Sequence, residues 1–342
     1  MIVRARAPLR LGLAGGGTDV PPYCDQYGGY VMNVTIDKYA YVTLDPSPDG
    51  LLHLHAVDTD VSAVLSPDQV SPEPGPLQLL KGVYLRIVAQ FLGGRAPALR
   101  VRTHSDAPPG SGLGSSSTMV VALVTAFAEY FSLALGEYEI AQLAYDIERK
   151  DLDLAGGRQD QYAAAFGGFN FMEFYAGDHV VVNPLRVKEW IWAELESSLV
   201  LYFTGVSRES AKIIDEQSRN IRENRADSLD AMHRLKLEAS RMKEALLRGD
   251  LVRFAEVMRA GWIAKKQSAH SISNALIDDL ETLAMDNGAR ATKVSGAGGG
   301  GFMMFVCDPA DRVLLSRALA TRGGSVFDFH FNPHGAVAWR VP

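Results

Sequence analysis

The segment that most constrains the fold is PPGSGLGSSSTMV, which runs from Pro108 to Val120. Its glycines at positions 110, 112 and 114 let the backbone approach a ligand closely, and the serines after them are good N-cap residues. An apolar run typical of a buried helix follows at once and continues to about Phe131. A glycine-rich turn that opens into a helix presents free backbone N–H groups, so the segment predicts a phosphate site. A flexible Gly/Ser connector is the alternative, and the apolar run argues against it.

This loop does not match two familiar nucleotide-binding patterns. No lysine follows its last glycine, as one does in a Walker A loop. The spacing is GxGxG rather than GxGxxG, and no apolar strand leads into the loop, which disfavours a Rossmann dinucleotide site. Taken alone, the loop predicts a bound phosphate without saying which molecule carries it.

Two other glycine runs narrow the prediction. The run APLRLGLAGGGTDVPPY, from Ala7 to Tyr23, places Arg10 and Asp19 around a turn that lacks side-chain bulk. The run KVSGAGGGGFMMF, from Lys293 to Phe305, places more glycines between two expected strands. Because loops on a rigid scaffold often carry binding and catalytic residues, all three runs are candidate site segments.

The composition is that of an ordinary globular protein without a nucleic-acid partner. Of 342 residues, 47% are hydrophobic and 22% are charged, which disfavours a disordered or collagen-like chain. Lys and Arg number 34 against 40 Asp and Glu, and the net charge of −6 has the wrong sign for binding phosphate backbones. Cys24 and Cys307 are far apart, which suits a reducing compartment, and the start MIVRARAPLR has no apolar signal core. The expected location is the cytoplasm, with no membrane span.

The expected elements divide the chain into two parts. The first half alternates strands and helices and predicts a mixed α/β domain, in which residues 30–44 suit paired strands. From Val206 to Arg259 charged residues are frequent and apolar residues recur at helical spacing, as in amphipathic helices with solvated outer faces. The change of character near Tyr202 predicts two domains, residues 1–202 and 203–342.

Together, and in this order, the three glycine segments resemble the GHMP small-molecule kinases, which include galactokinase, homoserine kinase and mevalonate kinase. The resemblance covers the chain from Ala7 to Phe305, and the middle segment is its most specific motif. It implies an α/β (α+β) fold of two domains: a mixed-sheet N-terminal domain that binds ATP, and a ferredoxin-like C-terminal domain with added helices. It also implies ATP and Mg²⁺ as cofactors, with nucleotide and acceptor meeting in the cleft between the domains.

The resemblance also assigns the reacting groups. The middle loop would wrap the triphosphate of ATP with Pro109, Gly110, Ser111, Gly112, Leu113, Gly114, Ser115, Ser116 and Ser117. Ser116 would be a Mg²⁺ ligand together with Glu148. The expected base is Asp160 of GGRQDQY, and Arg10 falls where relatives carry the cation beside it. This set suits phosphoryl transfer, because a cation keeps the carboxylate ionised to orient or deprotonate the hydroxyl. The alternatives are an exposed loop acid for Asp160 and a helix-surface charge for Glu148.

The resemblance points to a sugar phosphate as the acceptor. Galactokinases carry an acidic and a histidine side chain where this chain has Gly16 and Gly17, so galactose is disfavoured. The segments GGGTDVPPY and GGRQDQYAAAFGGF instead look most like the D-glycero-D-manno-heptose 7-phosphate kinases, which phosphorylate the anomeric hydroxyl on the way to nucleotide-activated heptose for polysaccharide synthesis. Fucokinases, with a related GGWSDTPP-like turn, are the alternative. A non-catalytic sugar or nucleotide sensor on the same fold is a second alternative.

The substrate-binding residues expected on this basis lie in the loops around these motifs. They are Gly16, Gly17, Thr18, Asp19, Gly298 and Gly299, with the cations Arg158, Lys150 and Lys293. One or more of these cations would hold the 7-phosphate, and solvated loop charges are the alternative. The expected partners are a small-molecule sugar phosphate and ATP, without nucleic acid or membrane, and a homo-oligomer is compatible with the sequence.

Overall fold

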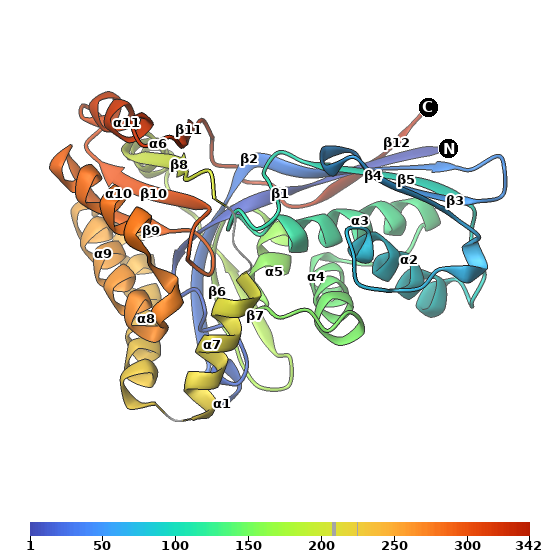
Figure 1. The fold of residues 1–342 in the computed structure, drawn as a ribbon, viewed down its shortest axis with the longest axis horizontal. Coiled ribbons are helices and arrows are strands. Elements are labelled where there is room, and N and C mark those ends of the chain that lie inside the picture. Colours follow the sequence, from blue (N-terminus) through green and yellow to red (C-terminus); the bar gives the residue numbers. More distant parts are fainter. Residues whose placement is uncertain (207–209, 224) are drawn as a thin grey trace.

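The molecule has two parts, each built on one sheet, and the part called the first here contains the larger sheet (Figure 1). The computed structural model describes residues 1–206, 210–223 and 225–342. In this part of the chain the sheet has eight strands, ordered β12-β1-β2-β5-β3-β4, with β6 pairing with β2 and β7. β3 and β5 are parallel and the other pairs are antiparallel, so the sheet is mixed, as expected. The strands are β1 Ile2–Ala14, β2 Gly29–Pro46, β3 Leu52–Ala56, β4 Val61–Leu65, β5 Leu99–Ser105, β6 Phe169–Phe174, β7 Val180–Pro184 and β12 Val337–Val341.

The residues expected as paired strands, 30–44, form part of one long strand, β2. Residues 29–34 of β2 pair with β6, and residues 40–46 pair with β5. β1 follows β2 on its other side, with irregularities in register between Pro8 and Ala14. The partners therefore come from distant segments, which the alternation of residues within 30–44 could not reveal.

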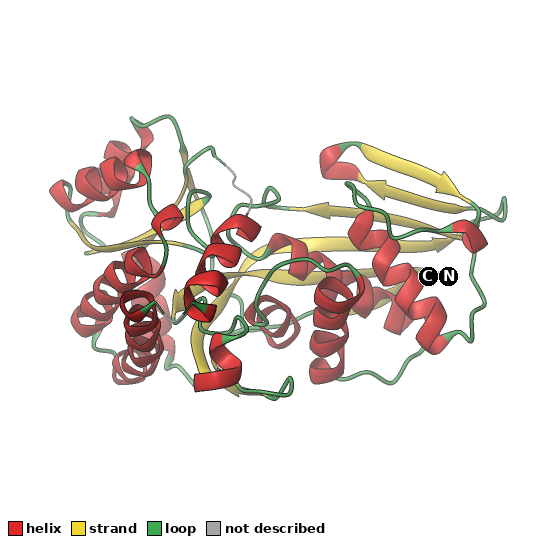
Figure 2. Ribbon diagram, turned by 60° about the horizontal axis from the view of Figure 1, so that its bottom comes forward, coloured by secondary structure: helices red, strands yellow, loops and turns green. Residues whose placement is uncertain are grey.

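Helices cover one face of this sheet (Figure 1, Figure 2). The apolar stretch after the serines forms α3, whose residues 120–124 are fully buried. Among the described residues, no helix is both long and apolar enough to span a membrane. The helices of this part are α1 Tyr23–Tyr27, α2 Gln78–Phe91, α3 Ser115–Phe131, α4 Glu137–Asp146 and α5 Gln159–Phe166, with short helical turns at Val57–Thr59, Pro67–Gln69 and Ile147–Asp151.

A second, antiparallel sheet has the order β11-β8-β10-β9 within the described chain. Its strands are β8 Leu199–Phe203, β9 Ala289–Val294, β10 Phe302–Cys307 and β11 Ser325–Phe327. The helices of this part are α6 Glu189–Ser198, α7 Ser210–Arg222, α8 Ala226–Arg248, α9 Leu251–Ser268, α10 Ala275–Asp286 and α11 Arg312–Ala320, with a short turn at His270–Ile272. The expected amphipathic helices in residues 206–259 are confirmed as α7, α8 and the first half of α9, while residues 207–209 and 224 lie outside the described residues.

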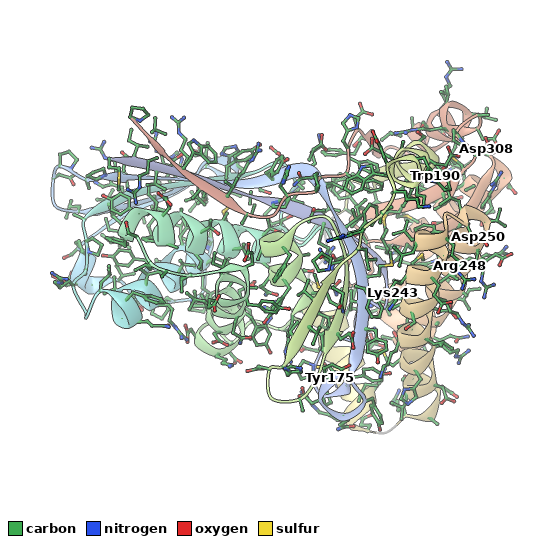
Figure 3. All side chains as sticks on the ribbon, turned by 180° about the vertical axis from the view of Figure 1, so that it is seen from behind. Tyr175, Trp190, Lys243, Arg248, Asp250 and Asp308 are labelled. Carbon is green, nitrogen blue, oxygen red and sulfur yellow. The ribbon has the colours of Figure 1, made fainter. Side chains whose placement is uncertain are left out.

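Helix α8 links the two parts of the molecule. Its Lys243 ammonium lies 3.9 Å from the centre of the Phe171 ring in β6 of the larger sheet. At its end, beside Arg248 in Figure 3, a Cβ on Gly249 would lie 2.2 Å from the Trp190 ring of α6. A glycine with φ of 72° therefore lets the chain turn into α9 beneath that ring.

The second sheet begins just before the domain boundary expected at residue 202. Tyr202 lies inside β8, a strand of the second sheet. At the other end of the chain, β12 leaves the second part and pairs with β1 in the larger sheet. Residues 203–342 therefore contribute one strand to the larger sheet, which the first residues of the chain begin.

Candidate active site

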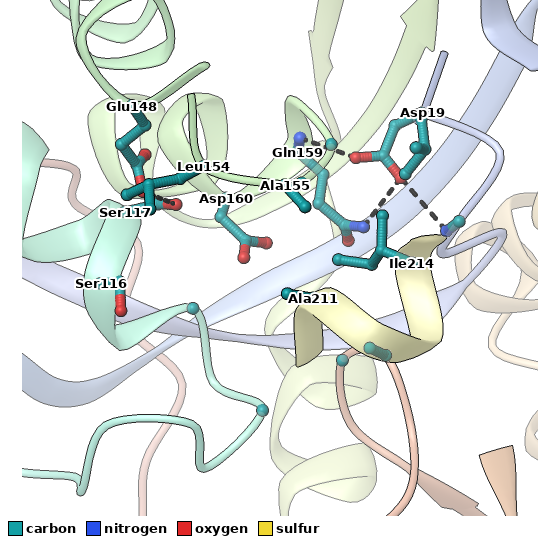
Figure 4. A pocket seen from close by; sticks show the side chains of 18 of the residues that line it. Asp19, Ser116, Ser117, Glu148, Leu154, Ala155, Gln159, Asp160, Ala211 and Ile214 are labelled. Atoms are coloured by element: carbon teal, nitrogen blue, oxygen red, sulfur yellow. Dashed lines mark hydrogen bonds between the residues drawn. The ribbon is translucent and has the colours of Figure 1, made fainter. Parts of the chain in front are cut away.

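A cavity of about 280 Å³ lies where loops of both parts converge (Figure 4). Three named segments contribute to it: the glycine turn (Gly15–Asp19), the phosphate loop (Pro108–Gly114) and the C-terminal glycine loop (Ser295–Gly301). The start of α3, the turn after α4, the start of α5, three residues of α7 and Lys265 of α9 also line it. All three glycine segments singled out in the sequence thus meet at one place.

The phosphate loop is held between the two sheets by backbone contacts. The Arg10 N–H of β1 donates to the Leu113 carbonyl at 3.1 Å, and the Phe302 N–H of β10 donates to the Ser111 carbonyl at 2.8 Å. Gly112 has φ of 86°, and a Cβ there would lie 2.4 Å from the Ser295 carbonyl oxygen. The glycine spacing therefore serves close backbone packing as well as access for a ligand.

The serines after the loop lie within α3 and do not cap it. The N-cap residue is Gly114, in the left-handed region with φ of 79°, and Ser115 is the first helical residue. The expectation that these serines serve as N-caps is wrong by this geometry. The first backbone N–H groups of a helix have no intrahelical partner, so the start of α3 offers N–H donors at the cavity.

Arg10 and Asp160 form an ion pair in the cavity wall. The Arg10 Nε donates to Asp160 Oδ1 at 2.7 Å, and Nη2 lies 2.6 Å from the same oxygen. Arg10 Nη1 also donates to the Gly112 carbonyl at 2.6 Å, which joins β1, α5 and the phosphate loop. The Asp160 side chain is 24% exposed and its carboxylate projects into the cavity, whereas Arg10 is buried. The structure therefore brings these two predicted residues together beside the loop.

Glu148 is a buried carboxylate in the turn after α4. Its side chain is 2% exposed and lines the cavity. Ser117 Oγ donates to Glu148 Oε1 at 3.0 Å, and Gln161 Nε2 donates to Oε2. Burial raises the pKa of Glu148, and the Arg149 guanidinium 3.7 Å away opposes the shift. The alternative of a helix-surface charge is therefore wrong for this side chain.

Ser116 and Ser117 occupy different environments. Ser116 is exposed and lines the cavity, but its hydroxyl points away from Glu148 in Figure 4. Ser117 is buried, and it is the serine that contacts Glu148. The predicted pair Ser116 and Glu148 thus shares the cavity without direct contact, and sequence reasoning overlooked the role of Ser117 in holding the glutamate.

Asp19 ties the glycine turn to the start of α5. Its Oδ1 accepts from the Gly17 N–H at 3.1 Å and from Gln159 Nε2 at 3.0 Å. Its Oδ2 accepts from the N–H groups of Arg158 and Gln159 at 2.9 and 3.0 Å. Thr18 holds the same turn, because its hydroxyl donates to the Gly15 carbonyl at 2.7 Å. Both oxygens of Asp19 are engaged, so its geometry fits a positioning role at the cavity edge.

Comparisons with known proteins identify the family of this chain. The chain matches the GHMP kinases N terminal domain over residues 78–168 and the GHMP kinases C terminal domain over residues 242–325. It is 47% identical to the D-glycero-alpha-D-manno-heptose 7-phosphate kinase of Campylobacter jejuni, over 99% of both proteins. The chain belongs to the GHMP kinases.

Other relatives of this GHMP kinase agree with that assignment. The solved structure of a D-glycero-D-manno-heptose 1-phosphate kinase from Bacteroides thetaiotaomicron has a TM-score of 0.85 and 45% identity over 99% of both chains. A mevalonate kinase structure, with a TM-score of 0.75 at 17% identity over 97% of this chain and 99% of that one, has the same fold. The L-fucokinase/L-fucose-1-P guanylyltransferase of Bacteroides fragilis is 27% identical over 93% of this chain and 36% of that protein. The expected two-domain GHMP kinase fold is confirmed.

Two of the predicted phosphate-binding cations of this kinase point away from the cavity. The buried Arg158 guanidinium pairs with Asp178 at 2.9 Å and donates to the Tyr175 carbonyl at 3.0 Å. Lys150 is half exposed and lies 2.8 Å from Asp178. Both cations already have an acidic partner outside the cavity, so the geometry corrects their expected role in holding the acceptor.

The remaining predicted substrate-binding residues of the C-terminal part, Lys293, Gly298 and Gly299, do not line the cavity. Lys293 is half-buried beside the end of β1, where its ammonium donates to the carbonyl groups of Gly12 and Leu13. Gly298 and Gly299 lie against the turn at residues 270–272, since the Gly299 N–H donates to the Ile272 carbonyl at 2.7 Å. Gly296 and Ala297 of the same loop line the cavity in their place.

Lys265 of α9 is a cavity residue that sequence reasoning missed. Its ammonium donates to the Gly16 carbonyl at 2.8 Å, and burial lowers its pKa to about 8. A signal was present: Met258, Trp262 and Lys265 follow one another at four- and three-residue steps, and the first two are buried. The apolar stripe of α9 therefore carries Lys265 to the buried face of the helix.

Proposed function

We propose that this kinase transfers the γ-phosphoryl group of ATP to the anomeric hydroxyl of D-glycero-D-manno-heptose 7-phosphate, giving the 1,7-bisphosphate. The choice of this acceptor is supported by the 47% identity, over 99% of both proteins, to the Campylobacter jejuni kinase named for that substrate. The Bacteroides thetaiotaomicron relative is named for a heptose 1-phosphate, so the position of the new phosphate is part of the test.

In this proposal Asp160 orients the anomeric hydroxyl and accepts its proton. The hydroxyl oxygen forms a bond to the γ-phosphorus as the bond from that phosphorus to ADP breaks, and the proton passes to the carboxylate. Arg10 holds Asp160 Oδ1 through two nitrogen atoms, which fixes the orientation of the carboxylate. The N–H groups at the start of α3 would receive the phosphate oxygens of ATP.

The residues at the Glu148 end of the cavity suit Mg²⁺. A carboxylate and a serine hydroxyl are hard oxygen donors, which this ion prefers, and Mg²⁺ typically takes only one or two protein carboxylates. Glu148 is buried with a raised pKa, so a neighbouring cation would favour its charged form. Glu148 and Ser116 would hold the ion, with Ser117 and Gln161 fixing the glutamate. When bound, Mg²⁺ neutralises charge on the phosphate oxygens of ATP.

The test is an ADP-release assay with ATP and Mg²⁺ against heptose 7-phosphate, heptose, mannose, fucose, galactose and mevalonate. We expect the highest kcat/KM with heptose 7-phosphate, and ³¹P NMR of the product should show a new anomeric phosphate beside the one at C7. A product phosphorylated elsewhere, or a higher kcat/KM with the unphosphorylated heptose, would contradict the proposal.

Fucose, the acceptor of a fucokinase, is the second candidate acceptor. Its support is the 27% identity over 93% of this chain to the fucokinase from Bacteroides fragilis. A preference for fucose in the same assay would replace the heptose acceptor while keeping the kinase. ATP binding without turnover of any acceptor would favour the sensor alternative.

A further inference from the structure

The cavity has two ends, separated by Asp160. Figure 4 shows Glu148 and Ser117 on one side of Asp160 and Asp19 and Ile214 on the other. The first end holds the start of α3 and the candidate Mg²⁺ ligands. The second end, formed by the glycine turn with α7 and α9, is therefore the place for the part of the acceptor remote from its reacting hydroxyl.

Lys265 is the cation at this second end. A Cβ on Gly17 would lie 3.0 Å from the Lys265 ammonium and 3.4 Å from Gln217 Oε1. The three residues therefore surround a common space, which is open because Gly17 has no side chain. The Lys265 ammonium has three N–H donors, and its hydrogen bond to the Gly16 carbonyl uses one of them.

The charge of Lys265 is not balanced by a contact with a carboxylate. Of the cations that line the cavity in the described part of the chain, Arg10 contacts Asp160 and Arg149 lies beside Glu148. Lys265 forms no ion pair with any described carboxylate: the charge of the nearby Asp19 favours its protonated form, but the Asp19 oxygens accept from N–H groups instead of from Lys265. A buried ammonium that no carboxylate contacts is unfavourable unless another group supplies more negative charge.

A second lysine, Lys293, adds to this imbalance when it is protonated. Lys293 contacts the Gly12 and Leu13 carbonyls, and burial together with the charges of Lys265 and Arg10 lowers its pKa to about 7. It borders a separate cavity of about 20 Å³, which Lys265 and Gly16 also line and which has room for about one water molecule. Lys293 does not line the main cavity, so it affects the second end only through the charge that it carries when protonated, which a bound anion would favour.

We propose that Lys265 binds the phosphate monoester of the acceptor, with Lys293 adding positive potential from beside the end of β1. This inference rests on the proposed function and names the group that selects a phosphorylated sugar over a free one. A phosphate carries a charge between −1 and −2 near neutral pH, and it can accept the two unused N–H donors of Lys265. A sugar hydroxyl would accept one hydrogen bond and leave the excess positive charge in place.

The test compares Lys265→Met and Lys265→Arg with Lys266→Met as a matched control. Lys266 is the next residue of α9, but its ammonium pairs with Glu281 at 2.9 Å outside the cavity. In Lys265→Met we expect the ratio of kcat/KM for heptose 7-phosphate to kcat/KM for unphosphorylated heptose to fall about tenfold or more. Lys265→Arg should keep part of the ratio, and Lys266→Met should keep all of it.

Calorimetric binding of heptose 7-phosphate and heptose without nucleotide separates this inference from the proposed function. Wild-type protein should bind the phosphorylated sugar more tightly, and Lys265→Met should lose that difference. An equal loss for both sugars in Lys265→Met would overturn the inference, because it would show that Lys265 only holds the Gly16 carbonyl. If wild type discriminates in binding but transfers no phosphate to the heptose, the proposed function fails while the inference stands.

Discussion

Among single residues, Arg10 and Asp160 form one connected unit in the cavity wall. Arg10 reaches Asp160 Oδ1 through two nitrogens and the Gly112 carbonyl through a third. The same guanidinium therefore sets the position of both the expected base and the loop that would hold the γ-phosphate. Because a reacting oxygen must lie within hydrogen-bond reach of its base, small displacements of this pair should cost catalytic rate more than stability.

Substituting the expected base gives the first prediction. Asp160→Asn keeps the shape of the side chain but removes its capacity to accept a proton, so kcat should fall about 10²- to 10⁴-fold. ATP binding, measured by calorimetry, should persist. The matched control is Asp151→Asn, which removes a carboxylate paired with Arg86 outside the cavity and should keep its kcat. A kcat near wild type in Asp160→Asn would remove Asp160 from the role of base.

Glu148 gives a prediction on pH. Burial raises the pKa of its carboxyl in the folded state, so the folded protein retains a proton that the unfolded chain releases. The resulting contribution to stability is fully present below the unfolded pKa of about 4.3 and is lost as the pH rises through the folded pKa. In Mg²⁺-free buffer, Glu148→Gln should therefore gain in Tm relative to wild type as the pH rises above about 4.5.

The same variant tests the metal site. Adding Mg²⁺ and ATP should raise the Tm of wild type, because a ligand that binds the folded state stabilises it. The increase should be smaller in Glu148→Gln, which lacks the charged oxygen. Parallel melting curves across this pH range, or an equal response to Mg²⁺ and ATP, would contradict the assignment.

At the scale of elements, the phosphate loop depends on its contact with the C-terminal glycine loop. Gly112 and Ser295 come from opposite parts of the chain, and their backbones approach closely enough to exclude a Cβ at residue 112. The Ser295 hydroxyl also donates to the Gly112 carbonyl at 2.9 Å. The two loops therefore form one structural unit, and the shape of the phosphate site depends on both.

Gly112→Ala should disrupt this unit. Positive φ alone costs an alanine about 1–2 kcal/mol, and the collision with the Ser295 carbonyl adds to that. Gly93→Ala is the control for the first contribution, because Gly93 has φ of 59° and a Cβ there would have no atom within 4 Å. Denaturant titration should show a larger loss of unfolding free energy for Gly112→Ala, together with a higher KM for ATP. Equal losses in the two variants would mean that the loops can separate freely.

At the scale of the whole molecule, the chain begins and ends in the same sheet. Strand β12 pairs with β1 from Ile2↔Val341 to Arg6↔Val337, so it covers an edge that would otherwise expose unpaired backbone groups. The core of the second part also contains residues of β1 and β2, such as Leu9, Leu11 and Val34. Two sequence halves therefore fold into one interlocked structure.

Removing β12 should destabilise the N-terminal part of the molecule. A chain ending at Gly335 should have a lower Tm and a greater tendency to aggregate, because the edge of β1 is exposed. Hydrogen exchange of the amides in residues 2–6 should become faster. A chain lacking only Pro342, which lies outside β12, should behave as wild type. Unchanged exchange in β1 would show that the returning strand contributes little.

The family could be predicted from the amino-acid sequence, and so could several of the residues that meet around the cavity. Glycine spacing before an apolar helix, an arginine in β1 and an aspartate at a helix start are local patterns, and local backbone chemistry limits what such patterns can form. The helix α3, the mixed sheet and the convergence of the three glycine segments followed from these patterns and from the family resemblance that they carry. Residues that belong to a local sequence pattern could therefore be assigned to the cavity before the structure was known.

Which side chains face the cavity depends on how distant parts of the chain pack together. Arg158 lies next to the motif of Asp160, yet its guanidinium turns toward Asp178, whereas Lys265, more than a hundred positions later, reaches the Gly16 carbonyl. The strand β12 likewise finds its partner at the opposite end of the chain. The direction of a long side chain and the partner of a strand are set by contacts between distant segments, and a single sequence does not encode those contacts in any local pattern.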